Sequence, residues 1–142
     1  MLEKILSISG KPGLYKLLSR SRQNIIVESL DSIKKRMPVF TTDKIVSLAD
    51  IAMYTEEDDV KLVFILKNIL DKENGKPCSI DYKNASKAEL HEYFTSVLPN
   101  WDQDRVHDSD IKKLLQWYNI IINNNIDFSE DLKEEEAENA EE

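Results

Sequence analysis

The stretch LEKILSISGKPGLYKLLS (residues 2–19) decides how the first part of the chain folds. Two short runs rich in Ile, Leu and Tyr flank Gly10-Lys11-Pro12-Gly13. Two glycines and a proline within four residues predict a turn. Short apolar runs separated by turn formers are typical of β-strands. The stretch therefore predicts two strands joined by a tight turn.

Three more runs of the same kind follow, at residues 24–30, 36–42 and 44–54. Pro38 lies inside the second of them, and because proline has no N–H to donate, that strand is expected at a sheet edge or at a bulge. Five short strands at roughly ten-residue spacing indicate a small barrel or sandwich. We expect a small SH3-like five-stranded β-barrel over residues 1–55.

The pattern changes after residue 55 from strand-like runs to helical periodicity. An apolar stripe with an acidic first turn predicts a helix over 58–73. Ser86 with Glu89 is a capping-box pattern that opens a second helix. Apolar residues three and four apart predict a third helix from about residue 109 to residue 122. We expect a three-helix domain over 56–126 and hence an α+β protein.

The charge of the chain is distributed as a gradient. Residues 1–44 carry nine Lys/Arg and four Asp/Glu, whereas residues 129–142 carry eight Asp/Glu and one Lys, in a chain of net charge −8. A segment this polar buries too little apolar surface to offset its ordering entropy, so we expect a disordered acidic tail over 127–142, with a fraying helix as the alternative. The tail either solubilises the protein or folds back on the basic N-terminal segment.

Composition excludes several classes of protein. The single Cys cannot form an intrachain disulfide, and one Cys with two His cannot make a four-ligand zinc site without carboxylates. The longest apolar run, residues 62–66, is far shorter than a membrane span, and the first residues lack the apolar core of a signal peptide. We expect a cytoplasmic protein with no cofactor and no membrane association.

Four segments resemble a family of short bacterial proteins classed as a domain of unknown function. They are ISGKPGLYK (8–16), NIIVESLD (24–31), LPNWD (98–102) and SDIKKLL (109–115), the last with WYN (117–119). The resemblance covers residues 2–124 and implies a small β part, a small helical part and a variable charged tail. It implies no activity and no functional residue. A fold-level analogy links the first part to SH3-like or Tudor-like barrels, which bind peptides, proteins or nucleic acid.

Basic side chains of the first part are the candidate binding residues, because they cluster in or beside predicted turns. If the turns share one end of the barrel, these side chains form a positive patch suited to phosphate backbones. A stacking platform also needs an exposed aromatic, and Tyr15, Phe40 and Tyr54 are available. The alternative is that Lys and Arg occupy turns only because turns are exposed to solvent. The candidates are Lys11, Lys16, Arg20, Arg22, Lys34, Lys35 and Arg36.

The most metal-like stretch contains Asp102, Asp104, Asp108 and Asp110 with His107. Carboxylates at such spacing can hold calcium or magnesium, but the turn glycine and closing glutamate of a calcium loop are absent. Acidic residues also cap helices, and a helix is predicted to follow. We therefore expect helix caps rather than a metal site.

No catalytic constellation can be named. Cys78 lies in a Lys-Pro-Cys-Ser segment without a nucleophile motif, and His91 lies within the second predicted helix. We expect no enzyme. Two classes remain: a non-catalytic interaction or adaptor protein that uses the barrel surface and its junction with the helices to bind a protein partner, and a nucleic-acid-associated protein that uses the basic turns. The overall acidity disfavours the second class, and the sequence leaves the oligomeric state open.

Overall fold

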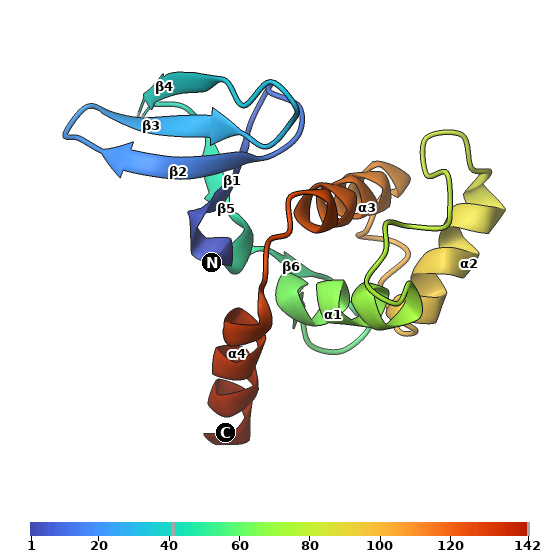
Figure 1. Cartoon of the computed structure of the whole chain (residues 1–142). Coiled ribbons are helices and arrows are strands. Elements are labelled where there is room, and N and C mark those ends of the chain that lie inside the picture. The colour runs from blue at the N-terminus through green and yellow to red at the C-terminus, as the bar shows by residue number, and fades with distance from the viewer. Residues whose placement is uncertain (41, 142) are drawn as a thin grey trace.

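The structure is a computed structural model that describes residues 1–40 and 42–141, with side chains described up to residue 138. Its elements form a sheet-containing first part, a helical second part and a C-terminal helix (Figure 1). The strands are β1 (Ile5–Ile8), β2 (Tyr15–Arg20), β3 (Asn24–Ser29), β4 (Arg36–Phe40), β5 (Ile45–Ser47), β6 (Ala52–Met53) and β7 (Val60–Lys61). The helices are α1 (Leu62–Lys72), α2 (Lys87–Val97), α3 (Asp108–Asn123) and α4 (Ser129–Glu141), with 3₁₀ turns at Leu2–Lys4 and Leu48–Asp50.

The first five strands form one antiparallel sheet in the order β4-β3-β2-β1-β5. The sheet is strongly curved but open (Figure 1), so the expected closed barrel of SH3-like type is not found. Closure would require β4 and β5 to pair, and no such pairing joins them among the described residues. The coarser α+β expectation is confirmed, with the five strands in an open sheet.

The free edge of β4 offers few backbone groups for pairing. Lys35 accepts a hydrogen bond from Ser29 N–H, so the alternation of an antiparallel ladder turns the backbone groups of Arg36, Pro38 and Phe40 toward the edge. Pro38 has no N–H, and the N–H and C=O of Phe40 are both bonded to Asp43. The prediction that the Pro38 strand lies at an edge is confirmed. The same features leave β4 a poor template for closing the sheet.

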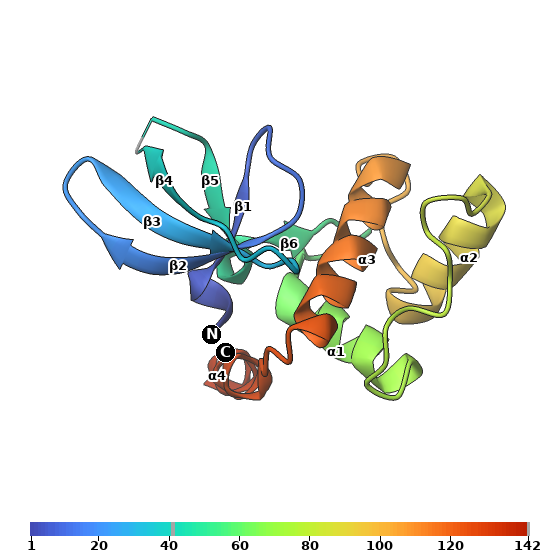
Figure 2. The same cartoon turned by 45° about the horizontal axis from the view of Figure 1, so that its top comes forward.

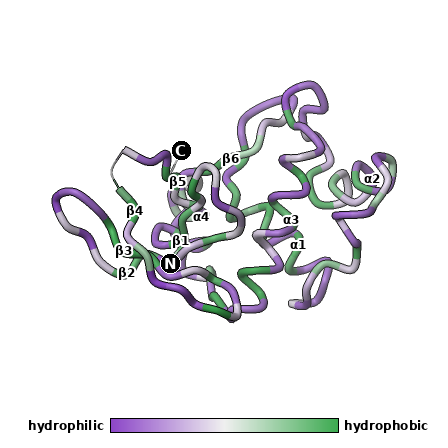
Figure 3. Tube along the Cα trace, turned by 90° about the horizontal axis from the view of Figure 1, so that it is seen from above, coloured by the Kyte–Doolittle hydropathy of each residue, from purple (hydrophilic) through white to green (hydrophobic). Residues whose placement is uncertain are grey.

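Two apolar clusters stabilise the two parts. The smaller one fills the concave face of the sheet and contains Leu6, Ile8, Tyr15, Val27 and Val39. The larger one joins β1 to the helices, with Ile5 and Leu14 packed together with the buried faces of α1, α2 and α3. Hydrophobic segments accordingly run along β1, α1 and α3, while the turns are hydrophilic (Figure 3). Strand β1 is thus buried on both sides and connects the sheet to the helical part.

Helix α1 begins at Leu62, four residues later than the predicted start at Asp58. The reason is that Val60 and Lys61 pair with Met53 and Ala52 as strand β7. The helix ends at Lys72, one residue before the predicted end at residue 73. Gly75 has φ +76°, a left-handed conformation that suits glycine after a helix.

Capping hydrogen bonds mark the first residues of α2 and α3. The Ser86 hydroxyl accepts the Glu89 N–H at 3.2 Å and donates to the Glu89 carboxylate at 3.0 Å, which confirms the predicted cap of α2. At the start of α3, Asp110 accepts the backbone N–H of His107 at 3.0 Å in a capping box. Local hydrogen bonds therefore set both helix starts.

The acidic C-terminal segment forms helix α4, so the expected disordered tail is replaced by a helix over Ser129–Glu141. The structure has four helices where three were expected. The helix starts beside Asp127, which accepts the Ser129 N–H at 2.9 Å, and Phe128 and Leu132 are buried in the main core. Residue 142 lies outside the described residues.

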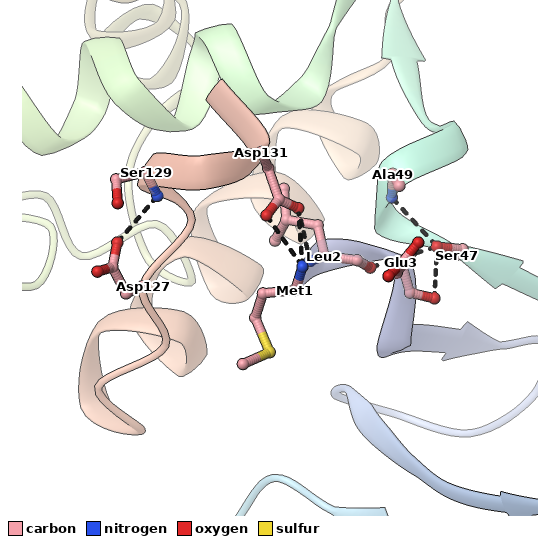
Figure 4. Close-up of polar contacts among 8 residues, drawn as sticks. All are labelled: Met1, Leu2, Glu3, Ser47, Ala49, Asp127, Ser129 and Asp131. Atoms are coloured by element: carbon pink, nitrogen blue, oxygen red, sulfur yellow. Dashed lines mark hydrogen bonds and ion pairs between the residues drawn. The ribbon is translucent and has the colours of Figure 1, made fainter. Parts of the chain in front are cut away.

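Helix α4 lies beside the N-terminus (Figure 2) and is tied to it by Asp131, which accepts the Leu2 N–H at 2.7 Å (Figure 4). A further ion pair joins Lys61 to Glu135 at 3.1 Å. Within the described residues, α4 makes no ion pair with any of the seven candidate basic residues. Among the described residues, the ion pairs that join α4 to the rest of the chain therefore run to Met1 and Lys61 and not to the basic turns.

Among residues 1–40 and 42–141, no helix combines the length and apolar character needed to cross a bilayer.

Candidate interaction surface at the sheet and its junction with the helices

The convex face of the sheet, called here the outer sheet face, is the side opposite the small apolar cluster. Strand register determines its members, because paired residues and residues two apart share a face. Lys16 pairs with Glu28, and Glu28 pairs with Arg36, so these three form one cross-strand row. The next row contains Ile26 opposite Pro38. The outer sheet face includes Lys16, Ile26, Glu28, Arg36, Pro38 and Phe40.

The outer sheet face carries more positive than negative side chains. Glu28 accepts a hydrogen bond from the Arg36 guanidinium at 3.3 Å, so its single carboxylate is engaged. Lys16 has no ion pair among the described residues and is exposed. Exposed ion pairs contribute little stability, so Arg36 remains available to a partner.

The outer sheet face also carries apolar side chains that are exposed to solvent. Phe40 is 54% exposed, Pro38 is exposed, and Ile26 is half-buried. Leu18, at the irregularity where β2 shifts register against β3, is 40% exposed nearby. Contiguous exposed apolar side chains with a polar rim mark interaction surfaces. Of the three aromatics considered, Tyr15 is buried, whereas Phe40 and Tyr54 are exposed.

All seven candidate basic residues are exposed, but the structure divides them between the two ends of the sheet. Arg20 and Arg22 lie at the end formed by the β2–β3 turn. The other five lie at the opposite end, where the β1–β2 and β3–β4 turns approach α3 (Figure 1). These five are Lys11, Lys16, Lys34, Lys35 and Arg36.

A polar groove of about 420 Å³ lies where this basic end meets the C-terminal end of α3. We call it the junction groove. The two sides approach closely, since the Asn124 amide donates to the Leu30 carbonyl at 3.4 Å. Its lining comprises Leu30, Asp31, Ser32, Lys34, Ile120, Asn123, Asn124 and Asn125.

Two groove residues have left-handed backbones that side chains rarely adopt: Lys34 with φ +50° and Asn125 with φ +53°. The Lys34 conformation is held by Asp31, whose carboxylate accepts the N–H groups of Ile33 and Lys34 and the Ser29 hydroxyl. These hydrogen bonds, led by that from Lys34, lower the pKa of Asp31. Strained backbone is concentrated at functional sites when the surrounding structure enforces it.

Sequence reasoning missed most of the junction groove. It found Lys34 and placed the end of a helix near residue 122, but it assigned no role in binding to the other polar residues of the groove, which are Asp31, Ser32, Asn123, Asn124 and Asn125. Three consecutive asparagines were the available signal, because asparagine both ends helices and tolerates left-handed backbone. The meeting of the two loops depends on non-local packing.

The acidic stretch considered as a metal site contains helix caps and ion pairs. Asp102 accepts the N–H groups of Asp104 and Arg105 and pairs with the Arg105 guanidinium at 2.8 Å, which lowers its pKa. Asp108 receives a 2.6 Å contact from His91, and this hydrogen bond lowers the pKa of Asp108. In the part of the chain that the structure describes, no group of three His, Cys, Asp or Glu could hold a metal ion.

Cys78 lies in a second cluster of titratable side chains, between α1 and α2. Burial raises the pKa of the Cys78 thiol to about 11, which disfavours the thiolate that a nucleophile needs. Glu73 is partly buried, which opposes ionisation. However, it accepts hydrogen bonds from Ser79 and from the Tyr93 hydroxyl at 2.7 Å, and its pKa is lowered overall. These contacts fix the loop after α1 and give Cys78 the environment of a structural residue.

The architecture and these surfaces define a two-part α+β protein with an open five-stranded sheet followed by helices. A family model described as Domain of unknown function (DUF6852) matches residues 51–121, and another, Domain of unknown function (DUF5606), matches residues 2–48. The chain belongs to the DUF6852 family, and its first part matches the DUF5606 model. This confirms the resemblance to a domain-of-unknown-function family.

A solved structure is similar over most of the chain. It is a solution NMR structure of a protein from Bacteroides vulgatus that is 57% identical, with a TM-score of 0.73 and 89% of each chain covered. A search of curated proteins gave no match.

Proposed function

We propose that the protein is a non-catalytic interaction protein that binds an acidic protein partner across the outer sheet face and its junction with the helices. The observation that carries the proposal is the exposed Phe40 and Pro38 on the same face as Lys16 and Arg36. Apolar contact supplies affinity at interfaces, and complementary charge supplies orientation and association rate.

Charge distribution supports an acidic partner. Residues 1–44 carry nine basic and four acidic side chains. Three of these four acids are engaged within the sheet: Glu28 by Arg36, Asp31 by its own turn, and Asp43 by the Phe40 N–H. Nine basic against four acidic side chains leave this segment with an excess of positive charge, which favours an acidic partner.

The limited hydrogen bonding at the β4 edge indicates how such a partner lies. Pro38 lacks an N–H and Phe40 is bonded to Asp43, so an added strand would find few groups to pair with. A partner is better accommodated across the face, where side chains rather than backbone groups make the contacts.

A nucleic-acid-associated protein is the second candidate, and exposed Phe40 is the observation that favours it. Bases stack on exposed aromatic rings beside basic residues in proteins that bind single strands. Against it, Arg20 and Arg22 are separated from the other five basic residues by the length of the sheet. A polyanionic backbone would have to cross this gap.

The test is a binding titration of the full chain with two labelled probes, a peptide of alternating glutamate and leucine and an oligothymidylate. The expected result is salt-sensitive binding of the peptide that Phe40→Ser weakens at least about fivefold. Tyr54→Ser is the matched control, because Tyr54 is an exposed aromatic outside the five-stranded sheet. Tighter binding of the oligothymidylate would support the second candidate, and binding of neither probe would contradict both.

A further inference from the structure

We infer that the junction groove is the anchor site for this partner and that it holds one carboxylate of an acidic peptide segment together with the peptide backbone beside it. This inference rests on the proposed function, because the groove adjoins the outer sheet face at the row of Lys16 and Arg36. The proposed function gives the surface that the partner covers. The anchor site specifies in addition where on that surface one partner carboxylate binds and which side chains bind it.

The groove has a size and place suited to a ligand. Its volume of about 420 Å³ lies within the range of ligand pockets, and it opens between the two parts of the chain, where binding sites commonly occur. Two of the three non-glycine residues with positive φ in the described chain, Lys34 and Asn125, line it. Two backbone conformations that are unfavourable for most residues therefore occur together in the junction groove.

Donors for a carboxylate come from three side chains. The Lys34 ammonium makes no ion pair, and the amides of Asn123 and Asn125 make no hydrogen bond, within the described residues. By contrast, the Asn124 amide is used internally, since it donates to Ile120 and Leu30. An ammonium with two free amide groups matches a carboxylate, which accepts several hydrogen bonds.

Negative charge in the same groove makes a phosphate backbone a poorer fit than a single carboxylate. Asp31 is a carboxylate with a lowered pKa, and the C-terminal end of α3 carries partial negative charge. A phosphodiester backbone would bring several anionic groups against these two. A peptide brings one carboxylate to the Lys34 ammonium, and its backbone N–H can donate to Asp31 Oδ2, which accepts no hydrogen bond among the described residues. The lining also contains no aromatic ring on which a base could stack.

The backbone conformations allow substitutions that remove a side chain without strain. Lys34→Asn removes the charge and keeps a residue that tolerates a positive φ. Asn125→Gly removes the amide and suits the same conformation. Arg22→Gln removes one positive charge from the β2–β3 turn at the other end of the sheet and serves as the control for net charge.

The experiment is a titration of hexaglutamate peptide into the full chain labelled with ¹⁵N, because the side-chain amide signals of Asn123 and Asn125 report on the groove directly. We expect both signals to shift, Lys34→Asn and Asn125→Gly each to weaken binding about twofold to fivefold, and Arg22→Gln to change it less. Shifts confined to Lys16, Ile26 and Phe40 would overturn the anchor site and leave the proposed function standing. Absence of any shift would overturn both. Unchanged melting temperatures would show that the two groove variants are folded.

Discussion

Asp131 of α4 accepts the backbone N–H of Leu2 at 2.7 Å, across 129 positions of the chain. The contact joins the two ends of the chain, because the first 3₁₀ turn packs against the start of the last helix (Figure 4). Asp131 also lies in the first turn of α4, where a carboxylate is stabilised by the helix dipole. One side chain therefore both favours its own helix and attaches it to the N-terminus.

The docking of α4 predicts that Leu132→Ala destabilises the protein by about 2 kcal/mol, the low end of the range for a buried leucine. Leu132 is 9% exposed and belongs to the main core, whereas Glu136 on the same helix is exposed. Urea denaturation measures the change, and faster hydrogen exchange at the Leu2 N–H would show that α4 has detached. Glu136→Ala is the control and should leave both unchanged. Equal stability of the two variants would mean that α4 does not dock.

The cap of α2 predicts that Ser86→Ala lowers stability by about 0.5–2 kcal/mol. The Ser86 hydroxyl accepts the Glu89 N–H, and alanine would leave that donor to water. A thermal melt measures the loss. Lys87→Ala, at the next exposed position, should have a much smaller effect, and a melt of Ser86→Ala that does not move would refute the role of the hydroxyl.

Local signals in the sequence predicted the features that depend on neighbouring residues. The Ser86–Glu89 pair gave the start of α2, and the apolar spacing from Ile111 to Ile122 gave α3. Pro38 placed its strand at an edge. Each of these features depends on hydrogen bonds or periodicity within a few residues, which a single sequence displays.

Features that depend on distant residues were not predictable in this way. Whether the sheet closes into a barrel depends on whether β4 pairs with β5. The late start of α1 at Leu62 depends on the pairing of Val60 with Met53. Helix α4 was missed because its polar composition indicates disorder, while its attachment depends on Phe128, Leu132 and the distant Leu2. The junction groove likewise exists only once the β3–β4 turn meets the end of α3.

The contact between His91 and Asp108 predicts a change in the acid titration of Asp108 on His91→Phe, which removes the ring N–H and keeps an aromatic ring beside Trp101. The His91 hydrogen bond lowers the pKa of Asp108 from its ordinary value of 3.8. Because the folded-state pKa lies below the unfolded one, the contact stabilises the fold above pH 3.8 and is lost as pH falls through the folded value. An NMR titration of the Asp108 carboxyl should show its pKa rising toward 3.8 in His91→Phe. The carboxyl of Asp102, paired with Arg105, should not change. An unaltered Asp108 titration would mean that the contact does not form in solution.

The edge of β4 predicts that Pro38→Thr promotes self-association. Threonine restores an N–H that the ladder alternation directs outward, beside the outward-directed backbone groups of Arg36, and it favours strand conformation. The variant therefore offers a continuous edge on which a second chain can pair. Phe40→Thr is the matched control: it introduces the same residue on the same strand and face, but the N–H at that position is already bonded to Asp43. Sedimentation velocity over a range of concentrations should show more association for Pro38→Thr than for the unmodified chain, and none added for Phe40→Thr. If Pro38→Thr sediments as the unmodified chain does at every concentration, proline is not what protects this edge.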